Sequence, residues 1–206
     1  MSSRTEDVLL MIADISGYTR FMVANQTELE HSHQIVGALL EAIIEEVEIP
    51  LEVAKLEGDA VFLYLVQADD RDAALPRARA KLMRFFAAFQ STLAELAAAT
   101  RCACGACIHI DALRLKVVAH SGTALIYTIA SRTELAGVDV IILHRLLKNS
   151  IPFDEYILLT ETAARDLELD LPVLATATED YEALGKVGVA AYRPVVEAPA
   201  GSPAEP

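Results

Sequence analysis

Residues 9–22 read LLMIADISGYTRFM. The stretch opens as a short run of large apolar side chains, which is typical of a buried strand, and Ser16-Gly17 then marks a turn. Asp14 stands between the apolar run and the turn, and no basic residue follows it until Arg20. A charge at the end of a buried strand is costly without a partner, which raises the question of what Asp14 binds.

The composition limits the classes of function. The 206 residues include 30 acidic and 17 basic side chains, so the formal net charge is −13. This balance argues against a nucleic-acid or anionic-membrane surface, which needs clustered lysine and arginine. No stretch reaches the roughly 18 apolar residues of a membrane span, and the N-terminal MSSRTEDV lacks the form of a signal peptide. We therefore expect a cytoplasmic protein that binds neither nucleic acid nor membrane.

The hydrophobic pattern predicts a single α+β domain over residues 1–197 and a disordered tail over 198–206, which is rich in Pro, Ala and Gly. Strands are expected at residues 7–15, 51–58, 59–66, 114–122, 123–131, the first part of 156–167, and 189–196. Helices are expected at residues 29–48, 71–99, 138–149 and the second part of 156–167. Tight turns are expected at Glu57-Gly58-Asp59 and near Gly122. This order implies one sheet with helices on one face.

A second carboxylate offers a reason for Asp14. If the turn at residues 57–59 lies beside the end of the first strand, Asp14 and Asp59 converge. Two carboxylates held close together repel unless a cation lies between them. Hard oxygen ligands at an open site suit Mg²⁺ or Mn²⁺. The alternative is that Asp14 caps the following turn and Asp59 is an ordinary turn residue, which is a common use of aspartate.

Four blocks of the sequence resemble the catalytic domains of class III adenylyl and guanylyl cyclases, and they come in the order of that family. They are IADISGYTRFM, KLEGDAVFLYL, LKVVAHSGTALI and ELAGVDVIILHRLL, and they cover residues 9 to about 147. LGKVGVAAYRPV resembles the closing strand of the family more weakly. The combination DISGYT, LEGDAV, LAGVDVI and HRLLKN also resembles a bacterial branch of that superfamily. The resemblance implies a ferredoxin-like βαββαβ core with a mainly antiparallel sheet.

The resemblance also implies roles for single residues. In the cyclases two aspartates hold two divalent metal ions on a nucleoside triphosphate, and these positions are Asp14 and Asp59. The backbone of Ile15, Ser16 and Gly17 would wrap the phosphates.

Further positions concern the base and the transition state. The base-reading residues fall on Lys55 and Glu134, and the arginine that steadies phosphate charge falls on Arg145. Lys186 loosely matches a late lysine that contacts phosphate. Each of these lysines has the alternative of an ordinary solvated side chain. The asparagine of the family falls on Ile141, which has no hydrogen-bond donor to orient a ribose or phosphate.

The cyclases share their active site across a dimer. The resemblance therefore implies a homodimer in which Asp14 and Asp59 of one chain face Lys55, Glu134 and Arg145 of the other. The product would be a 3′,5′-cyclic nucleotide, with release of pyrophosphate. The alternative is a catalytically inactive cyclase-fold module that binds a nucleotide or another ligand for sensing or regulation, which the isoleucine at the asparagine position favours.

A separate motif contains all three cysteines. TRCACGACIHID places Cys102, Cys104 and Cys107 within six residues, and His109 follows them. Three thiols and an imidazole form a known zinc ligand set, and Gly105 would let the loop wrap an ion. The alternative is a loop of reduced thiols without an ion. Class III cyclase domains have no such loop, so a zinc ion here would be a structural clip or a redox sensor specific to this branch.

Overall fold

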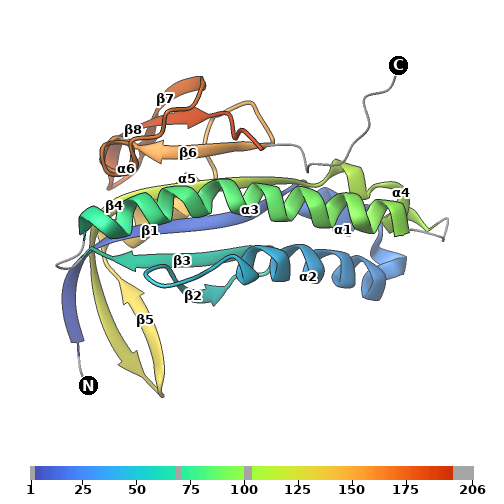
Figure 1. Cartoon of the computed structure of the whole chain (residues 1–206), viewed down its shortest axis with the longest axis horizontal. Helices are drawn as coiled ribbons and strands as arrows, with labels where there is room; N and C mark the ends of the chain where they lie inside the picture. Colours follow the sequence, from blue (N-terminus) through green and yellow to red (C-terminus); the bar gives the residue numbers. More distant parts are fainter. Residues whose placement is uncertain (1–2, 68–70, 100–103, 197–206) are drawn as a thin grey trace.

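The computed structural model describes residues 3–67, 71–99 and 104–196 (Figure 1). The predicted tail at 198–206 and Cys102 lie outside these ranges. In chain order the elements are β1 (Ser3–Ser16), α1 (Tyr18–Ala24), η1 (Gln26–Glu28), α2 (Leu29–Glu45), β2 (Glu52–Leu56), β3 (Ala60–Val66), α3 (Arg71–Ala99), α4 (Gly105–Ile108), η2 (Ile110–Ala112), β4 (Arg114–Ile129), β5 (Arg132–Ala136), α5 (Val138–Leu146), β6 (Tyr156–Thr160), α6 (Glu161–Leu167), β7 (Val173–Tyr181) and β8 (Gly185–Tyr192).

The strands form one sheet, and β1 lies near its middle. The order is β2-β3-β1-β4-β6-β8-β7, and β5 pairs with β4 beside this path. The strands β1 to β4 with α2 and α3 form a βαββαβ ferredoxin-like core, because β1 pairs antiparallel with both β3 and β4. The pairing of β4 with β6 is parallel. The predicted α+β class with a mainly antiparallel sheet is confirmed.

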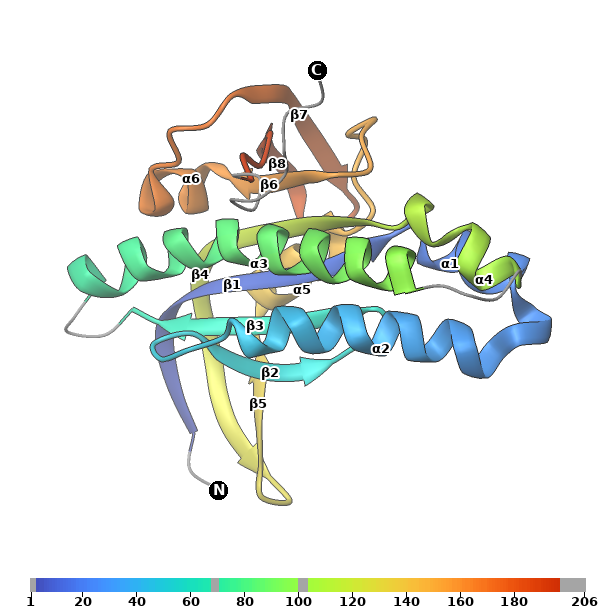
Figure 2. The same cartoon turned by 45° about the vertical axis from the view of Figure 1, so that its right-hand side comes forward.

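β1 is buried on both of its faces. Leu9 and Met11 pack with residues of α2, α3 and α6, whereas Leu10 and Ile12 pack with residues of α5. Successive side chains of a strand point to opposite faces, so α5 covers the face opposite to α2 and α3, and the expectation of helices on one face is wrong. In Figures 1 and 2, α2 and α3 run side by side across the sheet. Burial on both faces explains why the sequence of β1 is a continuous apolar run rather than an alternating one.

The predicted turn near Gly122 is wrong. Residues 114–129 form the single long strand β4, and Gly122 pairs with Val8 in the middle of it. A Cβ at Gly122 would lie 2.3 Å from Cγ of Asp139, so this glycine makes room for an α5 side chain rather than for a turn. The chain instead reverses at Ala130 and Ser131, which both have positive φ angles. Two such residues match the turn of a tight hairpin.

The end of the chain contains a strand that the sequence pattern did not predict. The strand and helix expected in 156–167 are present as β6 and α6, and β8 matches the expected last strand with shifted bounds. β7 was missed because its sequence, VLATATEDY, is half exposed and carries few large apolar side chains. Figures 1 and 2 show the start of β1 and the β4–β5 hairpin projecting from the body of the domain. Among the described residues, no helix has the length and apolar character to cross a membrane.

Candidate functional site

Asp14 and Asp59 line one cleft at the end of the central strands. The tight β2–β3 turn contains Gly58 at a φ of +74°, and the N–H of Ile15 donates a hydrogen bond of 3.1 Å to the carbonyl of Asp59. This bond ties the turn to the end of β1. The cleft has a volume of about 500 Å³, and its lining, called the carboxylate cleft below, consists of Asp14, Ile15, Ser16, Gly17, Tyr18, Thr19, Arg20, Val23, Asp59 and Lys116.

Lys116 is the basic partner of Asp14, and sequence reasoning missed it. Its Nζ lies 2.9 Å from Oδ2 of Asp14, and the two side chains are 17% and 14% exposed. The same Nζ also donates to the carbonyl of Leu147, at 3.3 Å. Asp14 and Lys116 are direct partners across the β1–β4 pair. A lysine within the apolar strand sequence LKVVAH was the available signal, because a half-buried ammonium needs an anionic neighbour.

Of the two cations in the lining, Lys116 is mostly buried and forms an ion pair with Asp14, whereas Arg20 is exposed. The pKa of Asp59 is raised to about 6, chiefly by burial and next by the nearby charge of Asp14, while a backbone hydrogen bond and Lys116 act in the opposite direction. One ammonium thus faces two carboxylates. Such an arrangement favours a proton or an added cation next to Asp59.

The turn after Asp14 requires its glycine. Gly17 has a φ of +86°, and a Cβ on it would lie 3.0 Å from the carbonyl oxygen of Ala112. Both the backbone conformation and the close approach of a neighbouring segment therefore exclude larger residues. Ile15 and Ser16 are buried beside it. The three residues line the carboxylate cleft together with the two aspartates.

Lys55 and Glu134 lie close to each other within one chain. Nζ of Lys55 forms a 2.8 Å ion pair with Oε1 of Glu57, and this hydrogen bond is the main reason that the pKa of Lys55 is raised, with Glu134 adding to the effect. Glu57 also contacts Nε2 of His144, at 3.1 Å. Burial acts to raise the pKa of Glu57, but the hydrogen bonds from Lys55 and His144 outweigh it and lower the pKa. Lys55 is therefore already paired with a carboxylate.

Arg145 and Ile141 line a second concave surface. This surface, called the α5 hollow below, has a volume of about 410 Å³ and is lined by Val140, Ile141, His144, Arg145, Lys148 and Tyr181. Its lining shares no residue with the carboxylate cleft among the described parts of the chain. Ile141 is 50% exposed there. Lys186 is exposed near the tip of the β7–β8 hairpin, paired with Asp180, and does not line either surface.

His120 contacts Asp139, which lies in the first turn of α5. Its Nδ1 lies 2.9 Å from the hydroxyl of Thr160, and its Nε2 lies 3.0 Å from a carboxylate oxygen of Asp139. Asp139 also accepts a 2.7 Å hydrogen bond from the N–H of Thr123. Burial acts to raise the pKa of Asp139, but these hydrogen bonds lower it overall. These contacts give the buried His120 a structural role at the start of α5.

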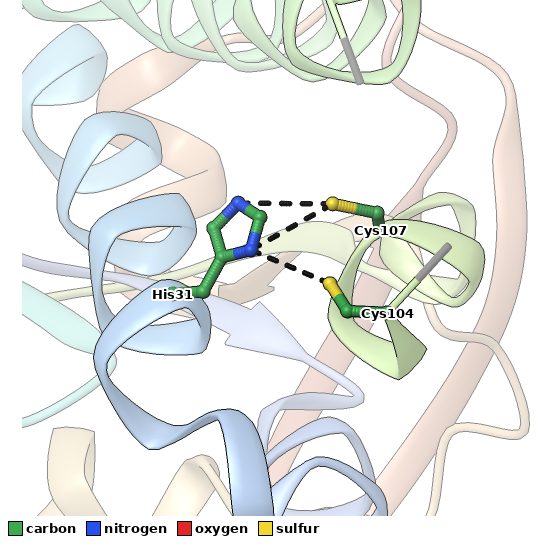
Figure 3. A group of neighbouring side chains, drawn as sticks. All are labelled: His31, Cys104 and Cys107. Carbon is green, nitrogen blue, oxygen red and sulfur yellow. Dashed lines mark hydrogen bonds between the residues drawn. The ribbon is translucent and has the colours of Figure 1, made fainter. Parts of the chain in front are cut away.

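The cysteine segment meets a histidine that sequence reasoning did not select. Side chains of His31, Cys104 and Cys107 converge, and their ligand atoms all lie within 4.8 Å of one another (Figure 3). His109, the histidine expected from the spacing, is exposed and is not in this group of described residues. The group could hold a metal ion. No local spacing links residue 31 to residue 104, so only the packing of α2 against α4 could reveal it.

The sequence comparisons match this chain to a family model and to a mycobacterial relative. A family model described as "Protein of unknown function (DUF2652)" matches residues 36–156. The chain is 34% identical over 152 residues to the uncharacterized protein Rv2561/Rv2562 of Mycobacterium tuberculosis (strain ATCC 25618 / H37Rv), covering 73% of this chain and 69% of that one.

Solved structures of nucleotidyl cyclases share the architecture. The crystal structure of the guanylyl cyclase Cya2 superimposes with a TM-score of 0.71 at 14% identity, covering 97% of this chain and 98% of that one. The adenylyl cyclase CyaB from P. aeruginosa superimposes with a TM-score of 0.65 at 11% identity, covering 97% and 98%. At these identities the likeness shows the fold alone. The structural similarity to class III adenylyl and guanylyl cyclase catalytic domains is confirmed.

Proposed function

The chain belongs to the DUF2652 family and has the fold of class III cyclase domains, and on that premise we propose that it is a metal-dependent nucleotidyl cyclase. It would bind a nucleoside triphosphate and convert it to a 3′,5′-cyclic nucleotide. The observation that carries the proposal is the pair of aspartates in one cleft. Asp14 and Asp59 come from sites far apart in the sequence, and the mostly buried Lys116 pairs with Asp14 while the charge of Asp14 raises the pKa of Asp59.

The donor atoms of the cleft fit Mg²⁺ or Mn²⁺. Carboxylate oxygens are the ligands that these hard ions prefer, and the remaining positions of an open site are free for water and phosphate oxygens. We propose that Asp14 and Asp59 hold two such ions, with Lys116 as the counter-ion of the pair when the metal is absent. Bound there, the ions would neutralise charge on the triphosphate and on the leaving pyrophosphate. Ile15, Ser16 and Gly17 would place backbone groups along the phosphates.

The remaining roles require a second copy of the chain. Arg145 lines the α5 hollow and not the carboxylate cleft, so we propose that Arg145 of one protomer serves the cleft of its partner. Lys55 and Glu134 would read the base from the same side as Arg145. A homodimer is supported by apolar side chains left exposed on the projecting β4–β5 hairpin, where Leu125 is 40% and Ile129 is 51% exposed. Exposed apolar side chains on a projecting arm suit burial by a partner.

The reaction follows from this placement. The 3′-hydroxyl of the ribose would attack the α-phosphorus, the bond from that phosphorus to the bridging oxygen would break, and pyrophosphate would leave. The hydroxyl proton would pass to solvent. Arg145 would donate hydrogen bonds to the phosphate oxygens as their charge grows, because a guanidinium presents forked donors. The chain would otherwise contribute positioning, which supplies a large part of such a rate enhancement.

The second candidate is a module that binds a triphosphate without turnover. Two observations favour it. Ile141, at the position of the family asparagine, presents an apolar side chain in the α5 hollow. Lys55 is paired with Glu57 and is therefore less available to a base. Such a module would sense or relay the presence of a nucleotide through the carboxylate cleft.

One experiment separates the two functions. Purified protein is incubated with ATP, GTP, CTP or UTP and Mn²⁺, and cyclic nucleotide and pyrophosphate are quantified together with triphosphate binding. A cyclic product that disappears in Asp59→Ala supports the cyclase. Saturable, metal-dependent binding that disappears in Asp59→Ala without any product supports the module. Absence of both binding and product would refute a nucleotide site.

A further inference from the structure

His31, Cys104 and Cys107 form a cluster outside the carboxylate cleft. Nδ1 of His31 lies 3.4 Å from Sγ of Cys104 and 3.8 Å from Sγ of Cys107. Figure 3 shows both sulfur atoms pointing toward the imidazole ring from the α4 segment, while the ring extends from α2. Sγ of Cys107 also lies 3.7 Å from Nε2, so Nδ1 contacts both sulfur atoms and Cys107 contacts both ring nitrogens.

These separations match those of ligands around one tetrahedral ion. Zinc binds sulfur at about 2.3 Å and nitrogen at about 2.0 Å, so two tetrahedral ligands stand about 3.5–3.8 Å apart. The observed contacts of 3.4 and 3.8 Å lie close to that range. Small side-chain rotations would therefore be enough to place Nδ1 and both sulfur atoms on one ion.

The donor types select the kind of metal. Two thiols and an imidazole are soft ligands that suit zinc and do not suit Mg²⁺ or Ca²⁺. The spacing Cys104-x-x-Cys107 is common in zinc sites. Cys107 is only 8% exposed and Cys104 is half-buried, so the site is sheltered from bulk solvent.

The cluster joins segments that lie far apart in the sequence. Cys104 is the residue before α4, Cys107 lies within α4, and His31 lies in the first turn of α2. The packing around it is tight, since a Cβ on Gly105 would lie 2.4 Å from Oδ1 of buried Asn25. Asn25 ends α1, and α1 supplies Tyr18, Thr19, Arg20 and Val23 to the carboxylate cleft. An ion at the cluster would therefore fix the corner between α1 and α2.

We propose that Nδ1 of His31 and Sγ of Cys104 and Cys107 bind one zinc ion, which clamps α4 to the α1–α2 corner. Binding would release the thiol protons to solvent. The ion would thereby stabilise α1, which lines the carboxylate cleft. Zinc binding at these three residues does not require nucleotide binding, so it can be tested independently of the cyclase proposal.

Metal binding by matched histidine variants tests the clamp. Tag-free wild type, His31→Ala and His109→Ala are expressed in medium with added zinc, their zinc content is measured, and the metal-free proteins are titrated with Co²⁺. Wild type and His109→Ala should hold one zinc per chain and show the thiolate-to-cobalt charge-transfer band. His31→Ala should lose at least about tenfold in affinity, because one of its ligands is gone. Equal affinity of His31→Ala and wild type would overturn the assignment of His31, and loss in His109→Ala alone would do the same.

A second measurement uses the unaltered chain, because Cys107 is buried and its replacement would disturb the packing around α4. The rate at which the thiols react with an alkylating reagent is measured with and without one equivalent of zinc. Zinc should slow the modification of Cys104 and Cys107, as located by peptide mass spectrometry, and should raise the melting temperature. Unchanged alkylation at both residues would overturn the clamp, as would a disulfide between them in protein purified without reductant.

Discussion

The carboxylate cleft and the α5 hollow differ in how firmly the fold holds their polar side chains. In the cleft, Asp14 and Lys116 are mostly buried and pair at 2.9 Å, and a backbone hydrogen bond fixes the turn that carries Asp59. In the hollow, the side chains of Arg145 and Lys148 are exposed. The apolar side chain of Ile141, also on α5, is half exposed. The cleft thus holds a preorganised ion pair, whereas the two cations of the hollow are exposed.

This difference assigns separate tasks to the two regions. Under the proposed function, the cleft with its two close carboxylates would bind the metal ion and the phosphates. An exposed arginine becomes effective only when another surface orders it, so under the proposed function the hollow would govern turnover in the cleft of a partner protomer. Variants in the two regions should therefore change different measured quantities.

The largest expected effect is on turnover. Arg145→Ala should lower the rate of cyclic nucleotide formation by about a thousandfold, because such an arginine acts on charge that develops in the transition state. Metal-dependent triphosphate binding should fall by less than about tenfold, since the cleft is untouched. Product formation and calorimetric binding, measured on the same preparation, give both numbers.

A mixing experiment supplies the control for that prediction. When Arg145→Ala and Asp59→Ala chains are combined, about a quarter of the wild-type activity should return, because half of the dimers would contain one intact shared site. Two inactive preparations that stay inactive after subunit exchange would contradict the division of the site between protomers.

Replacement of Lys116 should change both the Mn²⁺ affinity of the cleft and the stability of the metal-free protein. In Lys116→Gln the ammonium no longer competes for Asp14, so Mn²⁺ affinity should rise by about tenfold while the metal-free protein becomes less stable. Titration with Mn²⁺ measures the affinity, and thermal unfolding in the presence of a chelator measures the stability of the metal-free protein. An affinity that falls instead would mean that Lys116 helps to bind the ligand and is not a stand-in for the metal.

A substitution at Ile141, in the α5 hollow, is expected to raise turnover rather than lower it. Ile141→Asn restores the amide found in the cyclases and should raise turnover by about tenfold, which is less than the full value of an optimised donor. Ile141→Val is the matched control, because it keeps the apolar character and should leave turnover unchanged. If Asn and Val behave alike, the isoleucine does not limit the reaction.

The smallest expected effect is on stability. The raised pKa of Asp59, about 6, means that the folded protein binds this proton more tightly than the unfolded chain does. Its contribution to stability is therefore complete below the ordinary aspartate pKa and is lost as the pH rises through about 6. Asp59→Asn should raise the melting temperature of the metal-free protein by about 1–3 °C at about pH 8 and leave it unchanged at about pH 4. An equal shift at both pH values would show that charge is not the cause.

The strongest local patterns could be predicted from the sequence. The apolar run of β1 and the Glu57-Gly58-Asp59 turn predict their structures directly, because a doubly buried strand and a tight hairpin each have a short sequence signature. The convergence of Asp14 and Asp59 follows from the hairpin lying beside β1. Gly122 misled the prediction, since a glycine that makes room for a side chain resembles a glycine in a turn.

Long-range partners could not be predicted in this way. Lys116 and His31 act through contacts with Asp14 and with Cys104, and no sequence spacing encodes these contacts. His109 was the natural choice beside the cysteines, because it is close in sequence. The packing of α4 against α1 and α2 places His31 there instead.

The most direct test of the account measures Mn²⁺ binding by electron paramagnetic resonance in the presence of a non-hydrolysable triphosphate. Wild type, Asp59→Asn and Glu155→Gln are compared, where Glu155 is a half-buried carboxyl outside the cleft that accepts a hydrogen bond from Gln90. Asp59→Asn should lose about a hundredfold or more in Mn²⁺ affinity, whereas Glu155→Gln should match wild type. Equal Mn²⁺ binding by all three proteins would contradict the claim that Asp14 and Asp59 share a divalent cation.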